Sequence, residues 1–113
     1  DRDVSIALPQ MERWRDRTPV LVDDIISTAR TMIATLGRLN EIGFMSSVCA
    51  GIHGIFADDA YRALKAAGAA QIVTCNTVPH ESNDIDVDPA ITASIAALLT
   101  SGSDGLRSNG AAG

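Results

Sequence analysis

The chain has 113 residues, enough for one domain with one hydrophobic core. Its formal net charge of −5 argues against a nucleic-acid surface, which needs a basic stripe. No apolar run approaches the roughly 20 residues that cross a bilayer, and no secretory leader is visible. We therefore expect neither nucleic acid nor a membrane among its partners.

The sequence alternates short apolar runs, typical of buried strands, with segments in which apolar residues recur at helical spacing. Met32, Leu36 and Leu39 show that spacing, and Gly43 is a plausible end for their helix. We expect an irregular lead-in over 1–18 that contains a short strand at 4–8. Strands at 20–22, 47–52 and 70–75 then alternate with helices at 30–42, 58–67 and 89–99, and Asp88 caps the last helix. A disordered tail would follow over 101–113.

Strands that are separated by helices of this length imply right-handed crossovers and a parallel sheet. The predicted class is α/β, a three-layer, Rossmann-like arrangement with helices on both faces of the sheet. Residues 1–100 would form this single domain. Cys49 and Cys75 each lie in an apolar run without metal-ligand spacing, which predicts buried, reduced thiols in a cytoplasmic protein.

The segment from Val20 to Met32 carries the clearest chemical pattern. An apolar run ends in Asp23 and Asp24, and a hydroxyl-rich turn then opens a helix. In open α/β sheets, ligands bind at the carboxyl ends of the strands, and a helix N-terminus attracts anions. Acidic acceptors beside an anion cradle suit a ligand with both hydroxyls and a phosphate, such as a sugar phosphate.

Residues 23–31, DDIISTART, resemble the ribose-phosphate binding loop of the type I phosphoribosyltransferase fold. Three later segments narrow the resemblance to the ribose-phosphate pyrophosphokinases, also called phosphoribosyl pyrophosphate synthetases. They are GIHGIFADDA at 51–60, IVTCNTVP at 72–79 and IDVDPA at 85–90. In order and spacing, the resemblance runs from about residue 20 to about residue 99.

This resemblance implies a binding site for ribose 5-phosphate or phosphoribosyl pyrophosphate. Asp23 and Asp24 would lie near the ribose hydroxyls and help to hold a ribose-bound Mg²⁺, which is the cofactor that the family implies. The residues implied for substrate binding are Asp23, Asp24, Ser27, Thr28, Ala29, Arg30 and Thr31. Two adjacent carboxylates are costly without a cation or hydroxyl donors, which also favours a functional pair.

The resemblance also implies an intact enzyme that transfers diphosphate from ATP to ribose 5-phosphate in nucleotide biosynthesis. The chain would be the C-terminal portion of such an oligomeric transferase. We expect the 113 residues alone to be inactive, because an N-terminal half would hold ATP and no segment before Val20 resembles an ATP site.

Two positions in the loop depart from the family pattern. Ser27 stands where Asp is frequent, and Arg30 stands where Gly is common, so that Arg30 either adds positive charge at the phosphate or crowds the pocket. Two alternatives therefore stay open: a non-catalytic regulatory homologue of the synthetase, and a fragment of a base phosphoribosyltransferase. Outside the loop, we expect His53 to be structural more often than a ligand, and His80 to be solvated.

Overall fold

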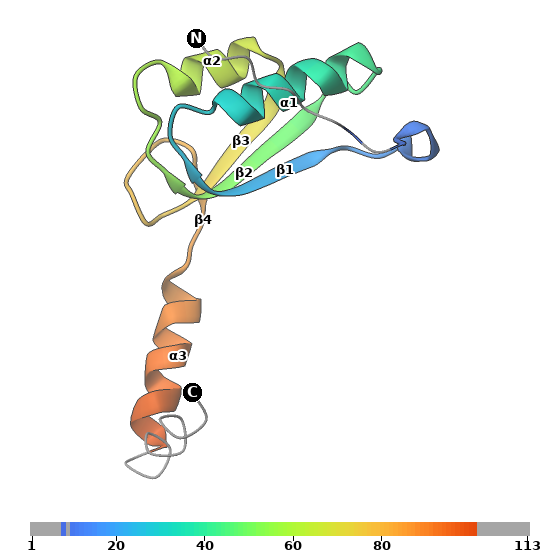
Figure 1. Ribbon diagram of the computed structural model, residues 1–113. Helices are drawn as coiled ribbons and strands as arrows, with labels where there is room; N and C mark the ends of the chain where they lie inside the picture. The colour runs from blue at the N-terminus through green and yellow to red at the C-terminus, as the bar shows by residue number, and fades with distance from the viewer. Residues whose placement is uncertain (1–7, 9, 102–113) are drawn as a thin grey trace.

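The computed structural model describes residue 8 and residues 10–101 (Figure 1). The strand predicted at 4–8 and the tail predicted at 101–113 therefore lie almost entirely outside the described residues. The elements, in chain order, are the 3₁₀ turn η1 (Glu12–Trp14), β1 (Val20–Ile26), α1 (Arg30–Glu41), β2 (Ser47–Gly54), α2 (Ala60–Ala66), β3 (Ala69–Cys75), β4 (Asn83–Ile85) and α3 (Asp88–Thr100).

The four strands form one parallel sheet in the order β1-β2-β3-β4. In register, Leu21 lies beside Cys49, and Cys49 lies beside Ile72. The helices α1 and α2 are the crossovers that parallel neighbours require. The predicted α/β class with a parallel sheet is therefore confirmed, and the sheet gains a short fourth strand in the acidic segment that contains Asp84.

The helix α1 ends where its sequence predicts. Gly43 has a left-handed backbone (φ 105°), and its N–H donates to the carbonyl of Asn40 at 3.1 Å. The N–H of Phe44 donates to the carbonyl of Leu39 at 2.8 Å, and both side chains are buried. This is a Schellman motif, which closes the helix and returns the chain to β2.

The prediction of helices on both faces of the sheet is wrong for the described residues. Both α1 and α2 pack on the same face, and α3 points away from the sheet (Figure 1). No side chain of α3 is buried. On the uncovered face, Val22 of β1 stays 76% exposed and Ile52 of β2 stays 44% exposed. The apolar pattern of α3 was typical of a covering helix, but it does not specify the surface that the helix covers.

The core lies between the sheet and the two helices, and it includes Leu36, Cys49 and Leu64, each fully buried. Ile26 closes this core at the carboxyl end of β1, directly before the candidate loop. The core therefore fixes the point at which that loop begins.

Both cysteines are free and buried, as predicted. Burial raises the pKa of Cys49 to about 11, so that only about a thousandth of this thiol is thiolate at pH 8. We expect neither Cys49 nor Cys75 to react with a disulfide reagent within minutes under native conditions, and both to react in denaturant. Absorbance of the released thiol measures this, and rapid native labelling of Cys49 would contradict the packing of the core.

Candidate functional site

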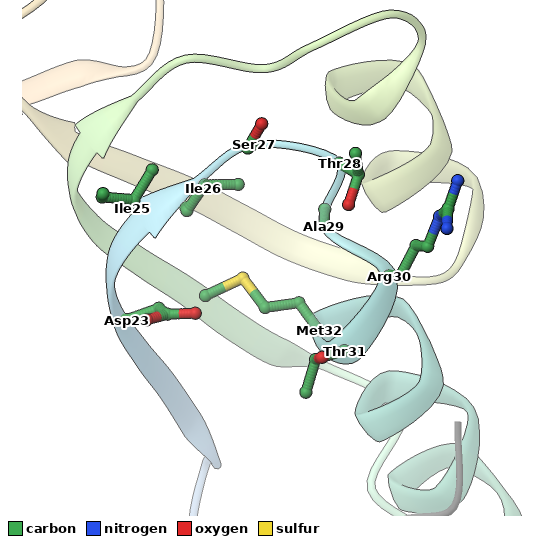
Figure 2. A pocket seen from close by; sticks show the side chains of 9 residues that line it. All are labelled: Asp23, Ile25, Ile26, Ser27, Thr28, Ala29, Arg30, Thr31 and Met32. Atoms are coloured by element: carbon green, nitrogen blue, oxygen red, sulfur yellow. The ribbon is translucent and has the colours of Figure 1, made fainter. Parts of the chain in front are cut away.

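The loop between β1 and α1 surrounds a hollow of about 160 Å³ (Figure 2). Side chains of β1, the loop and the first turn of α1 contribute to its wall. Three lining residues were not predicted, because their apolar character indicated core packing: Ile25, Ile26 and Met32. The complete lining is Asp23, Ile25, Ile26, Ser27, Thr28, Ala29, Arg30, Thr31 and Met32.

The start of α1 gives this hollow its anion-binding character. Ala29 caps the helix with a left-handed backbone (φ 63°), and its carbonyl accepts the first helical hydrogen bond, from the N–H of Ile33 at 2.8 Å. The first N–H groups of an α-helix have no partners within the helix, and the helix dipole is positive there. These donors begin at the hollow that Thr28 and Thr31 line.

The segment after β2 holds the beginning of the loop from the side of the sheet. The N–H groups of Ile55 and Phe56 both donate to the carbonyl of Ile26, at 3.0 and 2.9 Å. The N–H of Ala57 donates to the carbonyl of Ser27 at 3.0 Å. Hydrogen bonds between backbone groups thus hold the beginning of the loop in place.

The expectation that Asp23 and Asp24 follow the strand is wrong, since β1 continues to Ile26. Successive strand residues project to opposite faces of a sheet. Asp23 accordingly lines the hollow, whereas Asp24 is not among the residues that line it (Figure 2). The resemblance treated the two acids alike, and the structure separates them.

The carboxyl groups of Asp23 and Asp24 both accept hydrogen bonds from the backbone. Each accepts the N–H of the next residue at 2.8 Å: Asp23 from Asp24, and Asp24 from Ile25. A side-chain hydrogen bond with Asp23 lowers the pKa of Asp24, and the bond from Ile25 lowers it further. His53 adds a smaller favourable charge. These interactions favour the charged form of the Asp24 carboxyl group.

The Arg30 side chain extends away from Asp23, on the outer side of the loop (Figure 2). Its backbone stands at the first position of α1, and Arg30 is among the residues that line the hollow.

At the neighbouring strand end, His53 belongs to β2 and bonds to the β3–β4 connection. Its Nδ1 lies 2.7 Å from Thr77 Oγ1, and Thr77 donates its hydroxyl hydrogen to the carbonyl of Ile52 at 3.2 Å. The Nδ1 of His53 is therefore the donor to Thr77. This bond ties β2 to the segment after β3, which agrees with the structural role expected for His53.

Two further kinds of feature are absent from the described residues. No group of three or more His, Cys, Asp or Glu side chains there could enclose a metal ion. None of the helices in that part of the chain is long and apolar enough to cross a membrane.

The fold and the loop define the class of protein: a parallel α/β protein whose first strand leads through a hydroxyl-bearing loop into a helix N-terminus. The family follows from comparison with known sequences. The chain matches the phosphoribosyl synthetase-associated domain over residues 14–108 and belongs to that family.

Curated relatives agree with this assignment. The ribose-phosphate pyrophosphokinase of Sulfurisphaera tokodaii is 37% identical over 91 residues, which cover 78% of this chain and 31% of the relative. The enzyme of the same name from Corynebacterium efficiens is 32% identical over 90 residues, 74% of this chain and 28% of the relative. Human phosphoribosyl pyrophosphate synthase-associated protein 2 is 29% identical over 84 residues, 74% of this chain and 23% of the relative. The chain thus spans less than a third of the length of these relatives.

Proposed function

We propose that the hollow binds the 5-phosphate of ribose 5-phosphate, or of phosphoribosyl pyrophosphate, and that Asp23 orients the sugar ring. One observation carries the proposal: the loop residues 27–31 and Asp23 line a single hollow at the N-terminus of a 12-residue helix. A phosphate there would meet helix N–H groups and the hydroxyls of Ser27, Thr28 and Thr31. Charge-assisted hydrogen bonds of this kind are about twice as strong as neutral ones.

A carboxylate at the rim suits the hydroxyl side of the ligand, because it accepts hydrogen bonds from two hydroxyls at once. Mg²⁺ also fits this position. It prefers oxygen ligands, and proteins commonly hold it by one or two carboxylates together with oxygens of the substrate. Asp23 would hold the ion, which when bound neutralises phosphate charge.

A calorimetric titration of the 113-residue chain with ribose 5-phosphate tests the proposal. We expect saturable binding that is tighter with Mg²⁺ than with EDTA, and much weaker binding of ribose, which lacks the phosphate. Circular dichroism establishes that the titrated chain is folded. No heat of binding from a folded chain in either buffer would refute a working sugar-phosphate site.

The two acidic residues provide a matched pair of variants for the same titration. Asp23→Asn should weaken binding about tenfold or more, because a charged acceptor at the hollow is lost. Asp24→Asn should have a smaller effect, since Asp24 does not line the hollow. Equal losses in the two variants would contradict the unequal placement of the acids.

For the whole protein, we propose ribose-phosphate diphosphokinase activity, supported by the names of the pyrophosphokinase relatives. In that reaction the anomeric oxygen of ribose 5-phosphate attacks the β-phosphorus of ATP, and AMP leaves as the bond between the α- and β-phosphates breaks. This chain would position the acceptor, while an N-terminal half would bind ATP. We further propose that the protein is a cytoplasmic homo-oligomer with a type I phosphoribosyltransferase fold.

A second candidate is a non-catalytic partner of active synthetase subunits. The similarity to a human synthase-associated protein and the substitutions at Ser27 and Arg30 favour it. The names of the relatives favour both candidates over a base phosphoribosyltransferase. We expect the chain alone, given ATP, Mg²⁺ and ribose 5-phosphate, to form no AMP above the rate without protein. AMP formation that depends on ribose 5-phosphate would contradict both the missing ATP site and the non-catalytic role.

A further inference from the structure

A short segment between β2 and α2, residues 55–57, acts as a strap across the beginning of the candidate loop. Its three N–H groups supply the bonds to the carbonyls of Ile26 and Ser27 described above, at 2.9–3.0 Å. None of the strap residues is among those that line the hollow. Contacts that fix the position of the strap therefore also fix the backbone of Ile26 and Ser27, where the loop begins.

The strap and the loop share an unusual backbone conformation. Among the described residues, the non-glycine residues with positive φ are Ala29 (63°), Phe56 (50°) and Asp58 (55°). The first lies in the loop, the second in the strap and the third directly after it. Such conformations are disfavoured for side chains other than glycine, and they persist only where the surrounding structure enforces them.

The ring of Phe56 is packed against two other rings. It is packed edge-on against Tyr61 of α2, with centroids 5.0 Å apart and an interplanar angle of 74°. It is stacked on His80, with centroids 4.3 Å apart and an angle of 29°. A Cβ atom on Gly54 would lie only 2.6 Å from the Phe56 ring. The Phe56 side chain is thus closely packed by Tyr61, His80 and Gly54, and the stacked contact is the one with His80.

The His80 ring is itself fixed by a buried network. Its Nδ1 accepts the N–H of Ser82 at 3.0 Å, so this nitrogen carries no hydrogen. The Ser82 hydroxyl, 2.8 Å away, must then donate to it as well. Thr74 consequently donates to Ser82 across 2.7 Å and accepts the side-chain N–H of Asn83 at 2.9 Å. Thr74 and Ser82 are buried, which makes each bond costly to lose.

We propose that His80 is a positioning residue for the sugar-phosphate loop: its ring keeps Phe56 in the left-handed conformation from which the strap binds Ile26 and Ser27. The inference rests on the proposed function for its effect on ligand binding, but not for its effect on the strap. His80 lies in the β3–β4 connection, far from the loop in sequence, and its ring contacts Phe56 and, edge-on with centroids 4.6 Å apart, Tyr61.

Two substitutions separate the ring of His80 from its hydrogen bond. His80→Asn keeps an oxygen acceptor for Ser82 but removes the stacked ring. His80→Phe keeps a stacked ring but leaves the buried Ser82 hydroxyl without its acceptor. We expect His80→Asn to weaken ribose 5-phosphate binding by about 3- to 30-fold. We expect His80→Phe to bind within about threefold of the wild type, although it is the less stable chain in urea.

A control variant measures how far affinity follows stability alone. Phe44→Leu removes packing after the end of α1 opposite to the loop, where Phe44 is buried. It should lower stability while the affinity of the folded chain for ribose 5-phosphate stays unchanged. Unchanged affinity in His80→Asn, or affinity that falls in step with stability in all three variants, would overturn the proposal.

Hydrogen exchange of the backbone tests the strap without any ligand. The N–H groups of Ile55, Phe56 and Ala57 should exchange faster in His80→Asn than in the wild type. The N–H of Val48, which bonds to the carbonyl of Pro19 at 2.9 Å near the other end of the sheet, should not change. If the folded wild type fails to bind ribose 5-phosphate, the proposed function falls. The exchange rates then decide the positioning role, and unchanged rates in the strap would overturn it.

Discussion

Replacing Thr28 and Thr31 together by alanine is expected to weaken ribose 5-phosphate binding by about 100-fold or more. Both side chains line the hollow at the start of α1. A hydrogen bond to a charged group contributes about 1.5–3 kcal/mol, and each 1.4 kcal/mol changes affinity tenfold. Both threonines are exposed, so the fold should survive their loss. Calorimetry under the conditions of the wild-type titration measures the effect.

The matched control is Thr92→Ala together with Thr100→Ala. These threonines lie on the exposed helix α3, away from the hollow. The control changes the composition identically, so its affinity should equal that of the wild type. If both double variants bind alike, the threonine hydroxyls do not hold the phosphate. The backbone N–H groups would then have to account for all of the binding.

Gly54→Ala is expected to lower the free energy of unfolding by about 1–3 kcal/mol. A Cβ atom at this position would lie 2.6 Å from Phe56 Cε2 and 2.9 Å from Thr74 Cγ2. Phe56 and Thr74 are both buried, and Phe56 is packed against two other rings. Moving either side chain away from the new methyl group would therefore cost packing energy. Urea unfolding followed by circular dichroism gives the change.

Gly37→Ala provides the opposite case in the same chain. Gly37 lies within α1, and apart from the nearby backbone of the helix itself no heavy atom would come within 4 Å of an added Cβ. Alanine is favoured over glycine in a helix by about 0.5–1 kcal/mol, so this variant should be more stable than the wild type. If Gly54→Ala were stabilising as well, the close contact at Phe56 would be wrong.

The sequence was sufficient to predict the succession of strands and helices, because apolar periodicity reports which side of an element is buried. It was insufficient to predict where β1 ends. The strand runs four residues beyond the apolar run, through two exposed acids to Ile26. Exposed polar residues at a sheet edge carry no strand signal. The alternation that separates Asp23 from Asp24 therefore became visible only in the structure.

The placement of His80 shows a similar limit. A histidine in a polar connection, after Pro79 and before Glu81, suggested a solvated side chain. In the structure it is half-buried and stacks on Phe56, more than 20 residues earlier in the chain. Contacts of this kind depend on how two connections meet at the edge of the sheet, and no local pattern encodes that meeting.

The exposed position of α3 has a consequence for its conformational equilibrium. The helix has 13 residues, close to the length of about 12–15 at which isolated helices are marginal in water. No side chain of α3 is buried, so tertiary packing adds little to the helical propensity of its four alanines and two leucines. We therefore expect α3 in the isolated chain to exchange between helix and coil, with its ends fraying first. A surface that covered Ile91, Ile95 and Leu98 would shift this equilibrium toward the helix, and folding of the segment would then be coupled to its docking.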